Sequence, residues 1–407
     1  MKAIRITIAG LICVLILTCA PLQAEQGNDQ QEQAVQVDDS NPLFVIVKDG
    51  KFGFIDQTGK MVIEPQFSSA MPFSEGLAAV RICRKWGYID DAGSVVIKPR
   101  FDSADSFSEG LAAVIIGDWA TGEREYIDQT GEVVIKHQFS IGFPFSEGLA
   151  KVRIGDDVTG MWGFIDKTGE VVIEPQFNWA ESFSEGLALV KIGDPQTGKW
   201  GFIDKKGKVA IDPQYDRAYS FSDGLALVCI NNMQTGKVEG AGAIRRIVLD
   251  KWGFIDTTGK MVIEQQFYYA SPFSEGLSAV KVGDWATGKY GYINKAGEVV
   301  IEPQFADAAP FSEGLAMVMP NIDVNPERRV CYIDTAGKTV IELPGFITGE
   351  PFSNGLAKVY PIPGVLFSPL EPEDWGYIDK TGKYVWGPDL GVLYNDLQLE
   401  PGKNDQS

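Results

Sequence analysis

The sequence is poor in the residues that usually carry catalysis or cross-links. It contains one histidine and five cysteines in 407 residues. Two of the cysteines, Cys13 and Cys19, lie in an apolar run at the N-terminus, which leaves Cys83, Cys229 and Cys331 for a mature chain. Three cysteines without paired spacing exclude a disulfide scaffold and a structural zinc site. The three cysteines could still form one disulfide and leave one free thiol.

Long apolar runs are also lacking beyond the first residues. MKAIR supplies two positive charges, an apolar run of about 15 residues follows, and PLQA before Glu25 is typical of a cleavage site. We therefore predict a secretory signal peptide over residues 1–24, because the run is shorter than a membrane span of roughly 20 residues. The residues before Cys19 fit a lipoprotein signal poorly, so lipid anchoring is not expected. The mature protein should be exported, to the periplasm or the exterior.

Basic residues are few relative to acidic ones. There are 36 Lys and Arg against 55 Asp and Glu, which gives a formal net charge of −19. Such a surface repels nucleic acids and anionic lipid headgroups, so neither is expected as a partner. Residues 25–42 are polar and low in apolar content, which predicts a disordered spacer. Residues 388–407 form a C-terminal tail outside the repeats described next.

One six-residue phrase, FSEGLA, returns eight times with small changes. It begins at Phe73, Phe107, Phe145, Phe183, Phe221, Phe273, Phe311 and Phe352. An Ile-Asp or Ile-Asn pair precedes each phrase by 17 or 18 residues, whereas the distance from the glycine of one phrase to the next pair varies from 14 to 32. The constant segment indicates a packed framework, and the variable one indicates a turn that accepts insertions. Residues 43–387 are therefore expected to form one array of nine full or partial units.

The residues of each unit favour three antiparallel strands. In the unit that starts at Met161, WGFID and EVVIEPQF are rich in β-branched and aromatic residues and are separated by DKTG, which is typical of a bulged hairpin. GLALVKIG predicts a third strand. No window sustains a period of 3.6, so helix should be scarce. The expected fold class is all-β.

Two features of the unit indicate tight packing between neighbours. Ser-Glu-Gly in the repeated phrase predicts a bend, with apolar Phe, Leu and Ala around it. A small residue follows the last aromatic of the EPQF segment by three positions in every unit, and a larger side chain there should cost roughly 1–3 kcal/mol. These positions are Ala70, Ala104, Gly142, Ala180, Ala218, Ala270, Ala308 and Gly349.

The run W-G-[FY]-I-D-x-x-G-x-V-V-I-x-P-x-F, followed by F-S-E-G-L-A-x-V, resembles the bacterial WG repeat, also called the KWG repeat. The resemblance covers about residues 43–387. It implies tandem β repeats, often exported, without an assigned reaction. The pattern fails at Arg124-Glu125 and Val330-Cys331, which replace Trp-Gly, so looser packing is expected there. Phe52 and Tyr290 replace Trp alone.

The array could be open or closed. FVIVKDG before the first unit looks like a lone third strand, and the last unit ends without one, so an N-terminal strand could complete the last blade of a closed propeller. Nine three-stranded blades would fall outside the usual range of about four to eight four-stranded ones. We therefore expect an open or superhelical array, with a closed propeller-like ring as the alternative.

Catalytic and metal-binding patterns are not evident. His137 replaces the proline of EPQF, which indicates drift within the repeat rather than a catalytic base. No nucleophile elbow, HExxH, P-loop or EF-hand pattern occurs. The carboxylates of ID and FSEG recur in nearly every unit, as turn-making residues do, whereas a catalytic pair would be singular. We predict no enzymatic activity, no cofactor and no metal site.

Binding residues are expected on the variable turns. The repeated GDWATG places Trp119 and Trp285 on such turns, where each could contact a sugar or protein or fold back over its own hairpin. Further candidates are Tyr268, Tyr269, Trp179, Arg245 and Arg246. The sequence thus predicts a non-enzymatic scaffold of the bacterial envelope or exterior that binds a protein partner. A carbohydrate-binding module is the alternative, and a hydrolase is a weaker one.

Overall fold

The structure is a computed structural model that describes most of the repeat array. It describes residues 41–118, 122–136, 139–155, 159–194, 196–230, 251–283, 286–320, 329–344, 346–361 and 375–387. The expected signal peptide and C-terminal tail lie outside these ranges, as does most of the expected spacer. The described residues contain strands but no helix, and hence none that is long and apolar enough to cross a membrane. The all-β prediction is confirmed.

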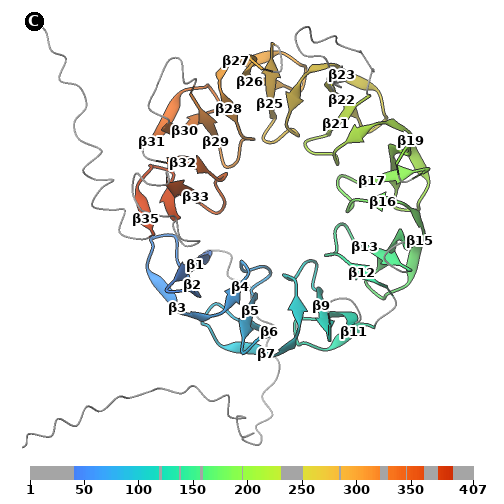
Figure 1. Ribbon diagram of the computed structural model, residues 1–407, viewed down its shortest axis with the longest axis vertical. Coiled ribbons are helices and arrows are strands. Elements are labelled where there is room, and N and C mark those ends of the chain that lie inside the picture. The colour runs from blue at the N-terminus through green and yellow to red at the C-terminus, as the bar shows by residue number, and fades with distance from the viewer. Residues whose placement is uncertain are drawn as a thin grey trace, which may run out of the picture. The chain divides into compact units, whose positions relative to one another are not determined.

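The described strands form nine antiparallel sheets, here called blades 1 to 9 in chain order (Figure 1). Blade 1 has three strands and the others have four, always hydrogen-bonded in chain order. Blades 1 to 3 contain β1 (Phe44–Lys48), β2 (Lys51–Ile55), β3 (Met61–Phe67); β4 (Ser69–Ala70), β5 (Ala78–Ile82), β6 (Lys85–Ile89), β7 (Val95–Phe101); β8 (Ser103–Ala104), β9 (Ala112–Ile116), β10 (Glu123–Ile127) and β11 (Val133–Ile135).

Blades 4 to 6 repeat this order. They contain β12 (Ile141–Gly142), β13 (Leu149–Ile154), β14 (Met161–Asp166), β15 (Val171–Phe177); β16 (Trp179–Ala180), β17 (Leu187–Ile192), β18 (Lys199–Asp204), β19 (Val209–Tyr215); β20 (Arg217–Ala218), β21 (Leu225–Cys229), β22 (Trp252–Asp256) and β23 (Met261–Phe267).

Blades 7 to 9 complete the array. They contain β24 (Tyr269–Ala270), β25 (Leu277–Val282), β26 (Lys289–Asn294), β27 (Val299–Phe305); β28 (Asp307–Ala308), β29 (Leu315–Met319), β30 (Arg329–Asp334), β31 (Thr339–Pro344); β32 (Phe346–Gly349), β33 (Leu356–Pro361), β34 (Gly376–Asp379) and β35 (Tyr384–Trp386).

The prediction of three strands per unit was wrong, because blades 2 to 9 each have four. The fourth strand is only two residues long in blades 2 to 8, too short to produce a sequence pattern, and it contains the small residue that was noted after each EPQF segment. This short strand is the innermost of its blade, and the VVIEPQF strand is the outermost (Figure 1). A Cβ at Gly142 would lie 2.7 Å from the Tyr126 hydroxyl of the preceding blade, which explains why the position is small.

The glycine of the Trp-Gly pair lies under a bulge of the outermost strand. In blade 4, Trp162 pairs with Phe177 and Phe164 pairs with Ile173, so Gly163 faces three residues, Glu174 to Gln176. A Cβ on Gly163 would lie 2.5 Å from the Ile173 carbonyl oxygen and 2.8 Å from the nitrogen of Pro175. The same register occurs in blades 1, 2, 5, 6 and 7. Only glycine leaves room for this bulge.

The two constant turns of the unit have defined local chemistry. The Oδ1 atom of Asp56 accepts hydrogen bonds from the amide and hydroxyl of Thr58, at 2.8 and 2.6 Å, and this turn chemistry recurs along the chain. In the FSEG turn, φ is +53° at Glu75 and +82° at Gly76, and Ser74 and Leu77 exchange two backbone hydrogen bonds. This is the two-residue hairpin geometry of a type I′ turn, which confirms the predicted bend.

The FSEG turns also join successive blades. The Ser108 hydroxyl donates to the Phe145 carbonyl of the next blade at 2.7 Å, and Glu109 Oε2 accepts from the Gly148 amide of that blade at 3.0 Å. Equivalent serine bonds link all eight turns in sequence. The acidic side chain makes the equivalent bond at each of these links. We call each serine and acid pair a latch. The repeated phrase therefore encodes contacts between blades as well as a turn.

Aromatic pairs form the core between blades. Phe164 of blade 4 lies edge-on to Phe183 of the FSEG turn in blade 5, with ring centroids 4.9 Å apart, and both are buried. Where the first aromatic is tyrosine, its hydroxyl also reaches the next blade; Tyr126, for example, donates to the Phe143 carbonyl at 2.7 Å. Such buried edge-to-face pairs add to the stability that apolar burial provides.

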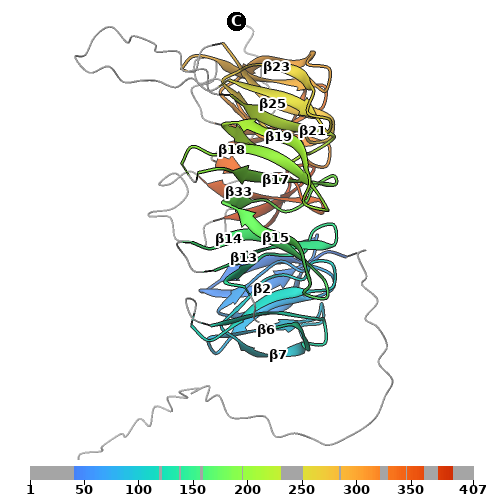
Figure 2. The same ribbon diagram turned by 90° about the vertical axis from the view of Figure 1, so that its right-hand side faces the viewer.

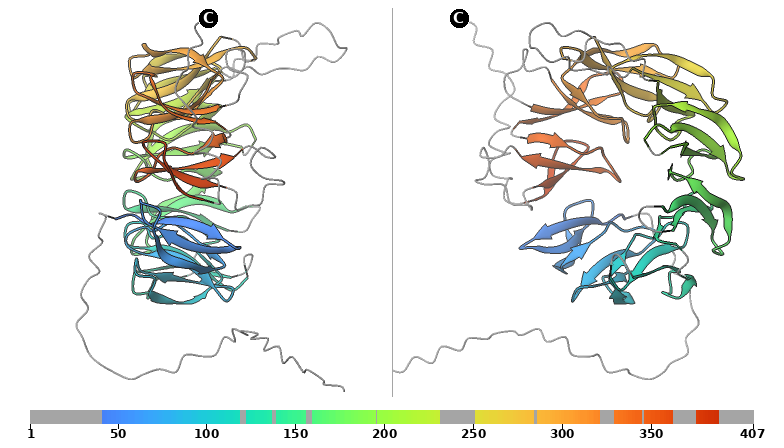
Figure 3. Two further views of the ribbon diagram at one scale, coloured as in Figure 1. Left: turned by 90° about the vertical axis from the view of Figure 1, so that its left-hand side faces the viewer. Right: turned by 45° about the vertical axis from the view of Figure 1, so that its right-hand side comes forward.

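The blades close into a ring, so the expectation of an open array was wrong. Blades 1 and 9 lie side by side (Figures 1 and 3), and they repeat the contacts seen elsewhere. Tyr377 packs edge-on to Phe44 at 5.5 Å, and its hydroxyl donates to the Val45 carbonyl at 3.1 Å. Gln57 Nε2 donates to the Asn354 carbonyl at 2.8 Å. β1 pairs with β2 within blade 1, so packing closes the ring without strand exchange.

The array is thus a closed nine-bladed propeller, in which the sheets follow one another around a common centre. Figure 2 shows the ring edge-on, with the blades stacked side by side. Nine blades exceed the usual range of about four to eight.

Candidate functional site

The most exposed aromatic side chains of the described residues lie together on one part of the ring. They are Phe143, Trp179, Tyr219 and Tyr269, between 38 and 50 % exposed. Each lies on, or directly after, the innermost strand of its blade, and the four blades are consecutive, from blade 4 to blade 7. We call these four residues the aromatic track.

The strand geometry points the four side chains to the same side of their sheets. Trp179 and Tyr269 occupy the position just before the small residue, whereas Phe143 and Tyr219 occupy the position just after it. Residues two apart on a strand project to the same face. The innermost strands of these blades border the centre of the ring (Figure 1), so the four residues lie at the inner edges of adjacent blades.

A second layer of aromatic rings supports the aromatic track. Trp162 lies 5.7 Å from Phe143 and 6.0 Å from Trp179 between ring centroids, so it bridges blades 4 and 5. Trp252 lies 5.5 Å from Tyr219, and Tyr290 lies 5.3 Å from Tyr269. These supports come from the Trp position of the WG pattern. The exposed rings are thus held on a packed base, which lowers the entropy lost on binding.

A buried lysine organises the first half of the aromatic track. Lys151 is only 6 % exposed, at a position that is alanine, leucine or methionine in most other blades. Its Nζ lies 4.3 Å from the Phe143 ring centroid and donates to Glu181 Oε2 at 2.8 Å. The other oxygen of Glu181 accepts from Trp179 Nε1 at 2.7 Å. This connected set fixes the orientation of the indole.

Basic residues accompany the aromatic track. Lys191 lies directly opposite Trp179 on the neighbouring strand, and Lys281 lies directly opposite Tyr269. In blade 6, Arg217 precedes Tyr219 by two residues and is exposed. Acidic residues lie beside these basic ones: the Asp194 carboxylate interacts with Lys191, and Asp216 directly precedes Arg217.

Tyr269 of the aromatic track and its supporting ring, Tyr290, remain protonated at neutral pH. Burial raises the pKa of Tyr269, and the nearby Asp307 carboxylate adds to the increase. The pKa of Tyr290 is raised by the same two causes. A phenolic hydroxyl in this state can donate a hydrogen bond to a ligand.

The aromatic track lies close to the variable turns. Trp179 pairs with Lys191, which is one residue from the end of β17, and the turn from β17 to β18 begins at once. In every four-stranded blade the variable turn joins the second and third strands at this end. The constant FSEG and DxTG turns lie at the opposite end of the strands. The ends of the strands that lead into the variable turns and the aromatic rings therefore lie on one face of the ring.

Of the residues predicted from sequence, Trp179 and Tyr269 belong to the aromatic track. Tyr268 points elsewhere and lies beneath Lys251, whose Nζ is 3.1 Å from the ring centroid. Trp119, Trp285, Arg245, Arg246 and His137 lie outside the described residues.

The sequence reasoning missed Phe143 and Tyr219. Both follow the small residue, a position held by Met71, Asp105 and other non-aromatic residues in the remaining blades. A comparison of the units at this single position would have singled them out. Their grouping with Trp179 and Tyr269 depends on the fourth strand, which the sequence did not reveal.

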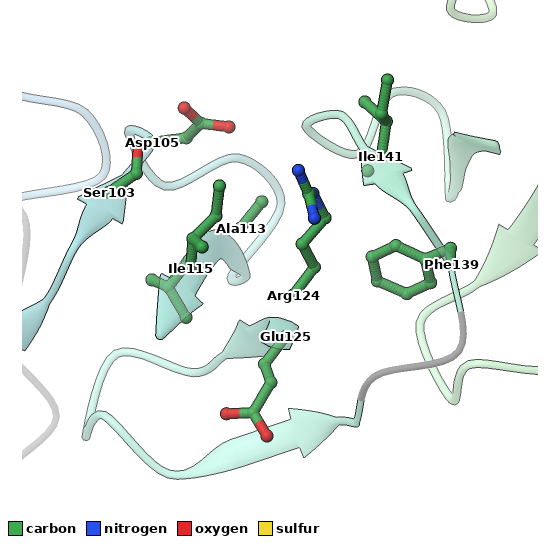
Figure 4. A pocket seen from close by; sticks show the side chains of 10 residues that line it. Ser103, Asp105, Ala113, Ile115, Arg124, Glu125, Phe139 and Ile141 are labelled. Atoms are coloured by element: carbon green, nitrogen blue, oxygen red, sulfur yellow. The ribbon is translucent and has the colours of Figure 1, made fainter. Parts of the chain in front are cut away.

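A small pocket lies between blades 3 and 4, where Arg124-Glu125 replaces Trp-Gly. Its lining includes Asp105, Arg124, Phe139 and Ile141, and the Arg124 side chain extends between Asp105 and Ile141 while Glu125 points away (Figure 4). Burial raises the pKa of Asp105. Arg124 stands at the Trp position of the WG pattern, so the pocket lies at the corner where looser packing was expected.

The recurring carboxylates have structural partners. Asp of the ID pair caps its own turn, and Glu of FSEG receives an amide of the next blade. Within the described parts of the chain, no three His, Cys, Asp or Glu side chains come together as metal ligands would.

Comparison with solved structures supports the propeller architecture. A structure titled as the eukaryotic initiation factor aligns with a TM-score of 0.57 and 12 % identity, over 84 % of this chain and 95 % of that one. The tricorn protease aligns over 84 % of this chain and 39 % of its own, with 12 % identity and a TM-score of 0.38. TolB from Acinetobacter baumannii has 12 % identity and a TM-score of 0.29, over 66 % of this chain and 77 % of its own. Of these three structures, only the first is similar enough to support the fold.

Comparison of sequences identifies the repeat. A search of curated proteins found no match to the chain. The model of the WG containing repeat matches seven segments, which together cover more than half of the sequence: residues 52–82, 86–118, 126–156, 162–194, 200–233, 252–284 and 290–321. The chain therefore belongs to the family of proteins built from the WG repeat.

Proposed function

We propose that the chain is an exported, non-enzymatic scaffold that binds an extended partner along the aromatic track. The observation that carries this proposal is the grouping of Phe143, Trp179, Tyr219 and Tyr269 on four consecutive blades. Exposed aromatic rings on a rigid base are typical of binding surfaces, because they bury a large area with little loss of side-chain freedom.

Two observations favour binding over catalysis. The repeated carboxylates are engaged in turns and latches, so they contribute to stability at many equivalent sites rather than to a single reacting centre. The described aromatic track has supporting rings and ion pairs, such as Lys151 with Glu181, but offers no nucleophile beside a general base. The N-terminal charge and apolar pattern supports export.

A protein partner was expected from the insertions at the variable turns. A carbohydrate partner is the second candidate, and the exposure of Trp179 and Tyr269 favours it because aromatic faces stack on sugar rings. Both candidates use the same face of the ring.

Site-specific photo-crosslinking in living cells tests the proposal for either class of partner. A photoreactive phenylalanine analogue would replace Tyr219 in one variant and Tyr268 in a control. We expect ultraviolet light to produce higher-mass adducts from the Tyr219 position and few from the Tyr268 position. Equal labelling from both positions, or none, would contradict a binding role for the aromatic track.

A further inference from the structure

We infer that the aromatic track binds a neutral polysaccharide, a chain of sugar rings that carry hydroxyl groups and no charge. This inference rests on the proposed function and names its ligand class. The described residues provide three elements that such a polymer needs: exposed aromatic rings, balanced charge, and polar groups held in place beside the rings.

The aromatic rings match the apolar faces of pyranose sugars. Trp162 lies 5.7 Å from Phe143 and 6.0 Å from Trp179 between ring centroids, so these three rings form one group across blades 4 and 5. In blades 6 and 7, the Tyr219 phenol is close enough to Tyr269 to contribute to the rise in its pKa. Rings on four consecutive blades suit a polymer with a repeating unit rather than a single small molecule.

The charged side chains beside the aromatic track balance one another. Each basic residue next to an exposed ring has an acidic residue close by. The pairs are Lys151 with Glu181, Lys191 with Asp194, Arg217 with Asp216, and Lys281 with Asp307, the last two both near Tyr290. The track therefore offers no net charge that would attract an anionic or a cationic polymer. A neutral ligand fits this balance.

The polar groups of the aromatic track suit hydroxyl groups. The Glu181 side chain is 39 % exposed, and its two oxygens accept hydrogen bonds from Lys151 and from Trp179 Nε1. A carboxylate has about four acceptor sites, so Glu181 can still accept from a ligand. The protonated hydroxyls of Tyr269 and Tyr290 can donate as well as accept. Sugar hydroxyls also do both, so they can satisfy each of these groups.

A proline-rich peptide is the main rival, because such peptides also bind along exposed aromatic rings. Proline has no N–H, so a run of prolines offers hydrogen-bond acceptors but no donors. The Glu181 carboxylate would lose water to such a ligand without gaining a hydrogen bond. A peptide that adds to a sheet needs a longer edge than the two-residue innermost strands of blades 4 to 7 provide. A neutral sugar polymer therefore fits this surface better.

The test measures binding of the purified full chain to short polymers by titration calorimetry. The neutral probes are cellohexaose, maltohexaose, mannohexaose and chitohexaose, which differ in the sugar and in its linkage. Hexagalacturonate supplies sugar rings with carboxylates, and a capped hexaproline peptide supplies uncharged rings without hydroxyls. We expect at least one neutral hexasaccharide to bind equally at low and high salt, because no ion pair forms. The hexagalacturonate and the proline peptide should bind at least about tenfold more weakly.

Variants locate the interaction. Trp179→Ala and Tyr269→Ala should each weaken binding of the best neutral sugar about tenfold. Tyr269→Phe keeps the aromatic ring and removes only the hydroxyl, so it should weaken binding about threefold. Tyr268→Ala is the matched control and should bind as the parent does, because Tyr268 lies beneath Lys251 and not on the track. Thermal unfolding of each variant checks that the propeller remains folded.

Three results with a bound ligand would overturn the inference. Equal or tighter binding of the proline peptide would replace the polysaccharide by a proline-rich protein. Tighter binding of hexagalacturonate, or binding that salt weakens, would show that the ligand is charged. Binding that Trp179→Ala and Tyr269→Ala leave unchanged would place the sugar site outside the aromatic track.

The absence of binding to every neutral hexasaccharide would also overturn the inference. The photo-crosslinking at Tyr219 in cells then decides separately on the proposed function. Adducts from Tyr219 would leave the binding role of the aromatic track intact with another class of partner. No binding and no adducts would remove both proposals.

Discussion

Blades 3 and 4 are neighbours with the same topology, yet they differ at the Trp-Gly pair of the repeat. Blade 4 has Trp162-Gly163 where blade 3 has Arg124-Glu125. Its outermost strand, β15, is seven residues long, whereas β11 has three residues in the described part of blade 3 and pairs there with β10 at two positions. The bulge of blade 4 needs a residue without a Cβ beneath it, and Glu125 does not meet this requirement.

Blade 8 shows a second way to lose the Trp-Gly pair. Cys331 replaces the glycine there, and its strand pairs without the wide bulge, so Cys331 lies opposite Glu342 in a continuous ladder. The sequence IELPGF replaces IEPQF in this blade, which changes the register of the outer strand. Among the described residues, the wide bulge thus occurs only in blades that keep the glycine.

Blades 3 and 4 also differ in the side chain that follows the small residue of the innermost strand. Blade 4 begins the aromatic track with Phe143, whereas blade 3 has Asp105 at the equivalent position. The Trp162 ring packs against Phe143. Arg124, at the equivalent position in blade 3, lines a pocket instead. The WG tryptophan therefore serves the fold in every blade that has it, and in blade 4 it also supports the exposed rings.

The largest effect should follow from filling the space above the glycine of blade 4. Gly163→Val would place side-chain atoms against the Ile173 carbonyl and Pro175, both of which are backbone and cannot rotate away. We expect a loss of about 3 kcal/mol in unfolding free energy, measured by chemical denaturation. Cys331→Val in blade 8 is the control and should cost less than about 1 kcal/mol. Equal losses would disprove the role assigned to the bulge.

Giving blade 3 the Trp-Gly pair of blade 4 should stabilise the protein. Arg124→Trp combined with Glu125→Gly would fill the pocket and remove the Cβ that obstructs the outer strand. Burial of the new aromatic side chain should stabilise the protein by about 2 kcal/mol. The midpoint of thermal unfolding is the measurement, with the reverse pair Trp162→Arg and Gly163→Glu in blade 4 as the matched control. A decrease for both pairs would mean that blade 3 has adapted to its own residues.

The latch that joins blades 3 and 4 should have the same strength as latches elsewhere, because the irregularity of blade 3 lies on its outer strand. Ser108→Ala removes the hydrogen bond to the Phe145 carbonyl, and Ser146→Ala removes its equivalent between blades 4 and 5. Each should cost about 1 kcal/mol. Ser353→Ala, in the last turn, should cost less. Blade 1 follows blade 9 around the ring and has no FSEG turn whose Phe carbonyl could accept the Ser353 hydroxyl. A much larger loss for Ser108→Ala would indicate that blade 3 depends on its neighbour.

The smallest predicted effect is on how the stability of the protein depends on pH. Burial alone would raise the pKa of Glu109, but hydrogen bonds from Lys167 and the Gly148 amide outweigh it and leave the pKa below its ordinary value of 4.5. The ionised latch therefore stabilises the fold above pH 4.5, and this contribution is lost as the pH falls through the lowered pKa. Unfolding measured from pH 6 to pH 3 should depend less on pH in Glu109→Gln than in the parent. Identical profiles would show that this carboxylate makes no net contribution.

The sequence supported many local features of the fold. The hairpin at DxTG, the bend at FSEG, the need for a small residue after EPQF and the irregularity at Arg124-Glu125 all follow from residue chemistry over a few positions. The number of strands per blade could not be predicted, because a two-residue strand has no periodicity. Two of the four track residues were missed for the same reason: Phe143 and Tyr219 are adjacent to strands that the sequence did not indicate.

By itself the sequence determined the repeating unit, its strands and turns, and the face from which insertions emerge, because hydrophobic alternation, Asx turns and glycine positions act over short distances. Only the tertiary structure decided that nine units close into a ring and that four aromatic rings from different units share one inner edge. Closure depends on the rotation summed over all interfaces and on the contact between Phe44 and Tyr377, which lie at opposite ends of the array. No local pattern encodes either quantity.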